Sequence, residues 1–229
     1  MRITARCHPD LEPILPRPVL AAQALPDWMR AMPGKVPAES LGGGEIRTLK
    51  HCPPFLDALG LGVLILLPTD LTVTDGQLSW DWDPPPLPDT AMTRAPIGVH
   101  VPEQAQGAPV DAGGRLVLKF INFWTLETDP GWSLLFTHPF NRPDLPFTTL
   151  TGVVDCDLFR DGYVHFPALL DRDFDGVIPA GTPVAQVVPV QRGGQLEVAA
   201  MTPDQIRRNR ATQDALQSAP GVYRKDYRR

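Results

Sequence analysis

The side chains best suited to chemistry lie in the second half of the chain. Asp155 and Asp157 are two positions apart in a predicted strand, so their carboxylates are expected to face the same side. Such a pair can bind a divalent cation, or mutual repulsion can raise the pKa of one carboxyl group so that it acts as a base. We predict catalytic roles for Asp155, Asp157 and His138. No cofactor is identified, although Mg or Fe would suit this set; the alternative is that both aspartates cap turns and face water.

Four further polar residues are predicted to bind a ligand. Asn141 and Arg142 offer an amide and a guanidinium fork, which suit a carboxylate, a phosphate or the edge of a base. They lie in the loop HPFNRPDLP, residues 138–146, which three prolines stiffen. His100 and Gln104 lie beside another predicted core strand. The alternative for Asn141 and Arg142 is that they only bond to backbone carbonyls, and the alternative for His100 is a surface or hydrogen-bonded histidine.

Common catalytic signatures are absent from the sequence. It has no GxSxG elbow, Walker A motif, GxGxxG fingerprint or HExxH helix. The three cysteines, Cys7, Cys52 and Cys156, form no CxxC pair, which excludes a disulfide framework or zinc ribbon. The flanking aspartates should raise the thiol pKa of Cys156 and make it inert.

Proline is the outlier in the composition of the chain. It accounts for 27 of 229 residues, and this density excludes a helical bundle because proline breaks helix interiors. The prolines alternate with apolar runs, so we predict an ordered, loop-rich protein. The expected fold is mainly β, a single β-rich domain with a C-terminal helix.

The elements that must position the candidate residues are mostly strands. The clearest signal is LTVTDGQLSWDW, residues 71–82, where two alternating runs flank Asp75-Gly76, a favoured hairpin turn. Thr202-Pro-Asp-Gln205 has the pattern of a capping box and predicts a helix to about Gln217. A short helix is expected over 21–32 and a helical turn after Pro53-Pro54. The other predicted strands span residues 45–51, 62–68, 115–124, 131–137, 149–159, 162–170, 178–191 and 195–201.

Charge divides the chain into two predicted parts. Residues 203–229 hold seven basic and three acidic side chains, so this helical segment is +4 and the β-rich body, residues 1–202, is −9. A proline-rich break at 83–98 interrupts the body. The basic segment can contact nucleic acid, an anionic ligand or the body of a neighbouring subunit, or it is a solvated end that aids solubility. As partners of the whole chain we predict a small anionic or nucleotide-like ligand and further copies in a homo-oligomer, not nucleic acid.

The sequence also indicates the compartment. Its N-terminus, MRITARCHPDLEP, has no apolar core of a secretory signal. The longest apolar run, Leu59 to Leu67, is much shorter than a bilayer span. We therefore expect a cytoplasmic protein that does not bind membranes.

Several segments resemble a family of bacterial and phage proteins of unknown function. The likeness lies in PDWMRAMP, LKHCPPFLDA, FINFW, PGWSLLFTHPFNRPDLPFTTLTGVVDCD and FDGVIPAGTPVAQVVPVQR, and covers about residues 10–192. More distantly, the order of GVVDCD, an acidic turn and GTPVAQVVPV is similar to the dUTPase and dCTP deaminase superfamily. That resemblance implies a β-clip fold, usually a trimer, with active sites between subunits.

Carried over by residue, the resemblance to the dUTPase superfamily gives Asp155 and Gln186 different roles. Asp155 would match the aspartate that activates water or binds the sugar hydroxyl. Gln186 would match a mainly structural glutamine of the last strand. The sequence departs from the family where an aromatic residue should stack on the base, at Leu158. Only Asn141-Arg142-Pro143 stands near the place of the serine-containing phosphate motif.

Three functions follow from these observations. The first is a β-clip protein that binds a small anionic or nucleotide-like ligand, a nucleotide-processing enzyme if catalytic, at a site between subunits. The second is a non-haem iron oxygenase with a cupin-like double-stranded β-helix, in which His100, His138 or His165 and a carboxylate hold the metal. The third is a non-catalytic, phage-related structural or assembly protein whose basic segment docks on a neighbour.

Overall fold

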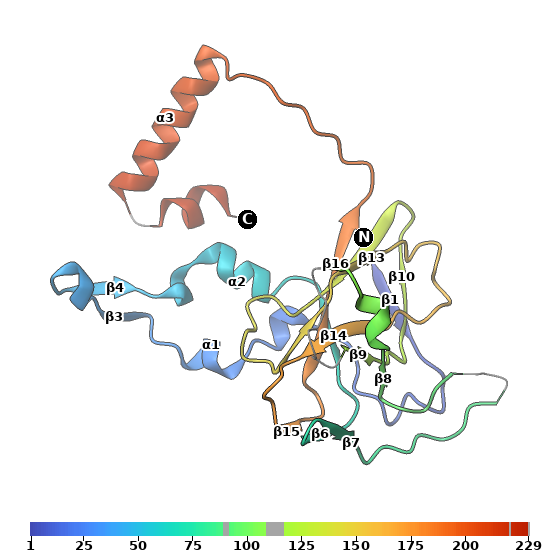
Figure 1. The fold of residues 1–229 in the computed structure, drawn as a ribbon. Helices are drawn as coiled ribbons and strands as arrows, with labels where there is room; N and C mark the ends of the chain where they lie inside the picture. The colour runs from blue at the N-terminus through green and yellow to red at the C-terminus, as the bar shows by residue number, and fades with distance from the viewer. Residues whose placement is uncertain (89–91, 109–116, 220, 229) are drawn as a thin grey trace. The chain divides into compact units, whose positions relative to one another are not determined.

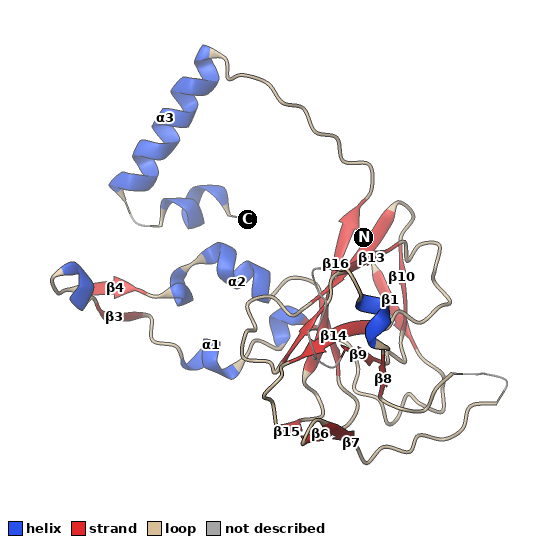
Figure 2. Ribbon diagram, viewed as in Figure 1, coloured by secondary structure: helices blue, strands red, loops and turns tan. Residues whose placement is uncertain are grey.

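The computed structural model describes residues 1–88, 92–108, 117–219 and 221–228. The protein is mainly β: antiparallel strands form several small sheets joined by long irregular segments, and a helix lies near the C-terminus (Figures 1 and 2). This confirms the predicted mainly β class with a C-terminal helix. The chain divides into a compact body, residues 1–192, and a C-terminal segment, residues 193–229. Within the described ranges, no helix has the length and apolar character needed to cross a membrane.

Two sheets form the centre of the body, and neighbouring strands in both are antiparallel. The larger has the order β13-β11-β16-β5-β2, and the smaller has the order β12-β14-β9-β8. The strands of the larger sheet are β2 (Val19–Leu20), β5 (Val63–Leu66), β11 (Trp132–Thr137), β13 (Gly152–Val154) and β16 (Pro183–Gln191). Those of the smaller sheet are β8 (Ile97–Val99), β9 (Val117–Phe120), β12 (Phe147–Thr149) and β14 (Phe166–Leu170).

The remaining strands form three minor sheets, in the orders β1-β10, β15-β6-β7 and β3-β4. Their bounds are β1 (Ile3–Arg6), β3 (Lys35–Pro37), β4 (Glu45–Arg47), β6 (Leu71–Thr74), β7 (Gln77–Ser79), β10 (Thr125–Thr128) and β15 (Gly176–Ile178). The α-helices are α1 (Asp27–Ala31), α2 (Pro53–Leu59) and α3 (Pro203–Ser218). Short single-turn helices are η1 (Ala21–Gln23), η2 (Glu39–Leu41), η3 (Leu49–His51), η4 (Pro102–Ala105) and η5 (Tyr223–Tyr227).

The main hydrophobic core lies where the two central sheets face each other. Phe136 of β11 stacks on Phe166 of β14 with ring centroids 5.6 Å apart, and Phe120 of β9 meets Phe147 of β12 edge-on at 4.9 Å. All four rings are buried. Burial of such side chains is the main favourable term in folding, at roughly 25 cal/mol per Å² of apolar surface removed from water.

Two local predictions are confirmed by their backbone geometry. Asp75 and Gly76 both have positive φ, 50° and 72°, as the tight turn between β6 and β7 requires. Thr202 and Gln205 form the predicted capping box of α3, with a hydrogen bond from Gln205 N to Thr202 Oγ1 (3.3 Å) and one from Thr202 N to Gln205 Oε1 (2.7 Å).

The prediction of one strand over residues 115–124 is wrong. Residues 115 and 116 lie outside the described ranges, β9 ends at Phe120, and the chain then bends. The buried amide of Asn122 causes the bend, since it donates to Trp124 O (2.7 Å) and accepts from Trp124 N (3.0 Å). These local bonds replace a strand ladder.

Two further strand predictions also need correction. The segment 149–159 does not form one strand, because β13 ends at Val154 and a turn follows, with Phe159 N donating to Asp155 O (2.8 Å). The predicted strand over 195–201 is not formed either; that segment has no strand partner among the described residues. In both cases the alternating pattern was present, but a strand also needs a neighbouring strand to bond.

Gln186 is the polar side chain that connects the sheet to the segments beside it. It lies within β16 and is only 1% exposed. Its Nε2 donates to the carbonyls of Ala58 (2.9 Å) and Leu61 (2.6 Å), and its Oε1 accepts from Phe140 N (2.7 Å). Both donors and the acceptor of the amide are therefore used, and the end of α2 and the loop 138–146 are held against β16.

We predict that Gln186→Leu lowers the free energy of unfolding by about 3 kcal/mol, because Leu61 O and Phe140 N would lose the Gln186 amide as partner and Ala58 O would keep the bond from Leu61 N. Urea unfolding monitored by tryptophan fluorescence measures the change. Gln191→Leu is the matched control, since Gln191 is exposed at the end of the same strand, and it should change stability by no more than about 0.5 kcal/mol. Equal effects of the two substitutions would contradict this role.

Candidate functional site

The carboxylates of Asp155 and Asp157 lie close together, but both contact the guanidinium group of Arg192 and leave no open site for a metal ion between them. Arg192, which directly follows β16, places Nη1 3.1 Å from Asp155 Oδ1 and Nη2 2.5 Å from Asp157 Oδ2. Ser133 Oγ donates to Asp155 Oδ1 (2.5 Å), and Gly131 N donates to Asp157 Oδ2 (2.9 Å). We call these four side chains, Ser133, Asp155, Asp157 and Arg192, the arginine clamp.

The clamp holds the carboxylate of Asp157 in the charged form. The hydrogen bonds from Arg192 and then from Gly131 N lower the pKa of Asp157 to about 2. The Asp157 side chain is only 7% exposed, whereas that of Asp155 is half exposed. Between them, burial and then the two neighbouring charges raise the pKa of the Cys156 thiol to about 11. A thiol with this pKa is a poor nucleophile, as the sequence predicted for Cys156.

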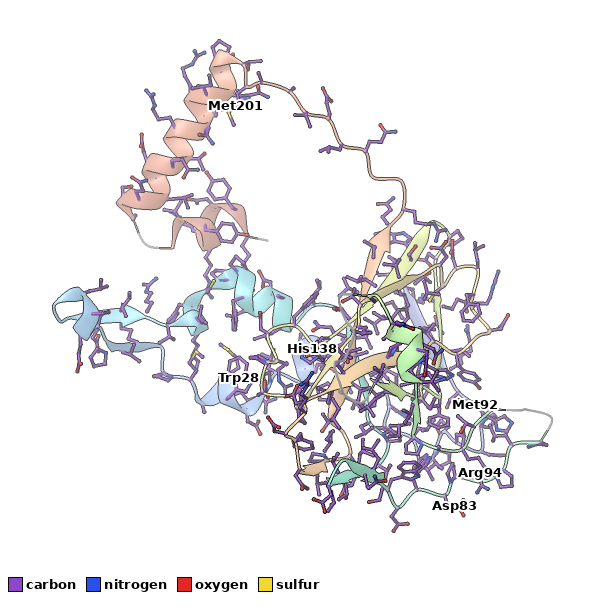
Figure 3. All side chains as sticks on the ribbon, viewed as in Figure 1. Trp28, Asp83, Met92, Arg94, His138 and Met201 are labelled. Atoms are coloured by element: carbon purple, nitrogen blue, oxygen red, sulfur yellow. The ribbon has the colours of Figure 1, made fainter. Side chains whose placement is uncertain are left out.

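His138 is occupied by backbone groups at both ring nitrogens. Nε2 lies 2.9 Å from Arg142 O, and Nδ1 accepts a hydrogen bond from Thr149 N (3.3 Å). This pattern requires the tautomer protonated at Nε2. The ring also packs edge-on against Phe147, with centroids 5.9 Å apart. His138 thus ties the loop 138–146 to β12, at the position labelled in Figure 3.

Arg142 and Asn141 are also committed within the body. Arg142 forms a bidentate pair with Asp144: Nε lies 2.9 Å from Oδ1 and Nη2 lies 2.9 Å from Oδ2. Burial raises the pKa of Asp144, but the bonds and charge of Arg142 outweigh it, so the pKa is lowered. Asn141 has a positive φ of 55°, which asparagine tolerates, and its amide donates to Phe55 O (3.4 Å). The proline-rich loop therefore satisfies its own polar groups.

His100 and Gln104 are a separate pair beside a small pocket. Gln104 Oε1 lies 3.1 Å from His100 Nδ1 and also accepts from Val101 N (3.1 Å), which caps η4. The pocket, about 270 Å³, is otherwise lined by the apolar residues Ala105, Ala108, Val117, Leu150 and Pro167. The ligand-binding role of His100 and Gln104 stays a prediction.

The candidate residues do not converge on one site. The arginine clamp lies at the start of β11 and His138 directly follows its end, so five residues, or roughly 17 Å of strand, separate Ser133 from His138. His165 has contacts of its own. Its Nδ1 accepts a hydrogen bond from Asn122 N (3.1 Å), and burial, with the nearby charge of Lys119, lowers its pKa. Among the described residues, no three His, Cys, Asp or Glu side chains are grouped so as to hold a metal ion.

A wide depression elsewhere on the body was not predicted. It has a volume of about 680 Å³, and Cys7, Glu12, Arg17 and Trp124 are among its lining residues. Arg17 and Glu12 pair with each other there. Burial and then Glu12 raise the pKa of the Cys7 thiol, while Arg17 opposes them, so this cysteine is no activated nucleophile.

The residue that sequence reasoning missed is Arg192. A signal was present, because two aspartates close to each other at 155 and 157 need a nearby cation, and Arg192 directly follows the predicted strand over residues 178–191. Asp157 and Arg192 are 35 residues apart in the sequence. Only the antiparallel pairing of β11 with both β13 and β16 brings them together.

Comparison of the chain with models of known families, with curated proteins and with solved structures finds no match. The resemblances described above therefore stay predictions.

We predict that Arg192→Met raises the pKa of Asp157 from about 2 toward its ordinary value of 3.8. A carboxyl group whose pKa is lower in the folded state adds stability above its unfolded pKa of about 3.9, and this is lost as the pH falls through about 2. The variant should therefore show a smaller change of Tm between pH 5 and pH 2. Carbon-13 NMR titration of the Asp157 carboxyl group measures the shift directly.

The control for this prediction is Arg160→Met. Arg160 is an exposed arginine 3.9 Å from Glu127 and makes no contact with the clamp. If the pKa of Asp157 stays at about 2 in Arg192→Met, the claim that Arg192 lowers this pKa is contradicted.

Proposed function

We propose that the protein is a non-catalytic assembly protein that self-associates through its C-terminal segment, residues 193–229. One observation carries this proposal: no described residue of that segment is buried, although it contains the 16-residue helix α3. A helix of this length is marginal in water without packing. We therefore expect that packing against a partner stabilises this segment.

Charge favours another copy of the chain as that partner. Residues 193–229 carry seven basic and four acidic side chains, a net +3, whereas residues 1–192 carry 14 basic and 22 acidic side chains, a net −8. Opposite potentials of this kind attract the segment of one copy to the body of another. In α3 the charge is concentrated in Arg207, Arg208 and Arg210. Arg207 is paired with Asp204 in the same helix, which leaves Arg208 and Arg210 as the better contacts.

The polar groups of the body support a non-catalytic role. The three predicted catalytic side chains each bond to a partner inside the body: Asp155 and Asp157 to Arg192, and His138 to backbone groups. Arg142 is likewise paired with Asp144. Such groups serve the stability of the body and would have to break these contacts to serve a substrate.

A second exposed element fits the same function. Strands β3 and β4 pair only with each other among the described strands, and the turn between them contains three consecutive glycines. Leu41 and Ile46, in and beside this turn, are exposed. A lone two-stranded hairpin is marginally stable in water, so this element too would gain from a contact.

For the body itself we propose the β-clip class. This is supported by the place of GVVDCD at the end of β13 and by the structural bonds of Gln186 in β16, both of which the resemblance to the dUTPase superfamily implies. In this proposal the body keeps a β-clip scaffold without its nucleotide chemistry.

We predict that Arg208→Glu/Arg210→Glu reduces the mass of the full-length protein in solution toward the 25.1 kDa of one chain. Glutamate is about as good a helix former as arginine, so α3 should persist while its attraction to an acidic body is lost. Light scattering over a range of protein concentrations measures the mass. Raised salt should weaken association of the unmodified protein in the same direction.

The control is Arg2→Glu/Arg30→Glu, which makes the same change of net charge on exposed positions of the body outside β3 and β4. It should leave the mass unchanged. An unmodified protein that has the mass of one chain at every concentration would overturn the proposed function.

A further inference from the structure

The C-terminal segment begins with a stretch that has the pattern of a strand. Leu196 and Val198 are two positions apart, so in an extended conformation they face the same side, with Glu197 facing the other. Their side chains are 89% and 86% exposed, and residues 195–201 have no strand partner among the described residues. Apolar residues in alternation are typical of a strand with one buried face.

The body presents a sheet edge of matching character. β13 is the edge strand of the larger sheet and pairs with β11 alone among the described strands. Its Val154 packs on the core, whereas Val153 faces outward and is 61% exposed. Val153 pairs with Leu135, and Leu135 pairs with Val188, which makes an apolar row across three strands. An added strand would extend this row by one residue.

We propose that residues 195–201 are donated to a second copy of the chain, where they pair with the free edge of β13. Leu196 and Val198 would then lie beside Val153 and continue its apolar row. Main-chain hydrogen bonds supply the affinity in this kind of strand addition, and the alternate side chains supply the specificity. The inference rests on the proposed self-association and names the surfaces that carry it.

Chain length points to a second copy and not to the same body. Adjacent strands are about 4.8 Å apart, so a strand outside β13 is three spacings, about 14 Å, from β16. The position beside Val153 also lies four residues, about 14 Å, back along β16 from Arg192. These two displacements are at right angles within the sheet and combine to about 20 Å, whereas Leu196 is four residues beyond Arg192 and reaches at most about 14 Å. Val198, six residues beyond Arg192, spans about 20 Å only when the chain is fully extended, and the reversal needed to run back along the sheet shortens that reach.

The start of the segment is also suited to leaving the body. The arginine clamp and a hydrogen bond from Arg192 N to Gly131 O (3.0 Å) fix Arg192. Gly193 and Gly194 follow at once, and Gly193 has a positive φ of 92°. The flexible glycine pair after a fixed residue lets the segment turn away from its own sheet. The basic charge of α3 further along then favours the acidic body that accepts the strand.

A cysteine-pair experiment tests the inference. Cys7 and Cys52, which are partly exposed, are first replaced by serine, and Cys156 is kept because it is buried. A chain with Val153→Cys is co-expressed with a differently tagged chain that carries Leu196→Cys or Val198→Cys. Under mild oxidation we expect a disulfide-linked pair of the two tagged chains, about twice the mass of one, for at least one of the two positions. Glu197→Cys, on the opposite side of the strand, is the matched control and should cross-link much less.

A second measurement does not depend on cross-linking. Leu196→Asp/Val198→Asp in the otherwise unmodified chain should reduce the mass measured by light scattering, and Val153→Asp should do the same. If the unmodified protein is always a single chain, the proposed function fails and this inference with it. If it self-associates but neither cross-link forms and these variants keep its mass, the strand inference alone fails. A disulfide that forms only when both cysteines are in one chain would show pairing with the same body and would overturn the exchange.

Discussion

The body depends on one buried amide. Gln186 lies in β16, the strand that has β11 on one side and β5 on the other, and its side chain bonds the carbonyls at the end of α2 and an N–H of the loop 138–146. Two of these groups, Leu61 O and Phe140 N, lie outside the helices and strands, and Ala58 O is at the end of α2. A single side chain with two donors and one acceptor bonds all three. The proline-rich segments beside the sheet are thereby tied to the buried part of β16.

The residues that the sequence marks as candidates for catalysis also have partners within the body. An aspartate pair, a histidine and an arginine in one stretch resemble a catalytic set when only their types are considered. In the folded chain the aspartates close around Arg192, His138 spans the ends of its own loop, and Arg142 pairs with Asp144. The contacts of His138 and Arg142 stabilise the loop 138–146, whose prolines prevent it from joining a ladder. Groups without a partner in the described part of the chain include the buried Nε2 of His100, the exposed segment after Arg192 and the edge of β13.

The sequence predicted elements well where the deciding forces are local. The hairpin around Asp75-Gly76 follows from backbone φ preferences, and the start of α3 from the reciprocal bonds of Thr202 and Gln205. It failed where a side chain bends the backbone, as at Asn122, or where a strand lacks a neighbour, as in residues 195–201. For the candidate site, it found both aspartates but neither Arg192 nor Ser133. Long-range pairing register, which decides those contacts, has no local signal.

Sequence alone determined the class of this protein: a proline content that excludes helical bundles, strands with buried faces, and a basic C-terminal helix on an acidic body. These properties follow from the residue composition and net charge, or from interactions between residues that are close together in the sequence. Tertiary structure alone decided which partners the polar residues have. Whether a carboxylate binds a metal ion or an arginine depends on which groups lie within about 3 Å of it. In this fold, antiparallel strand pairing places Arg192 beside Asp155 and Asp157.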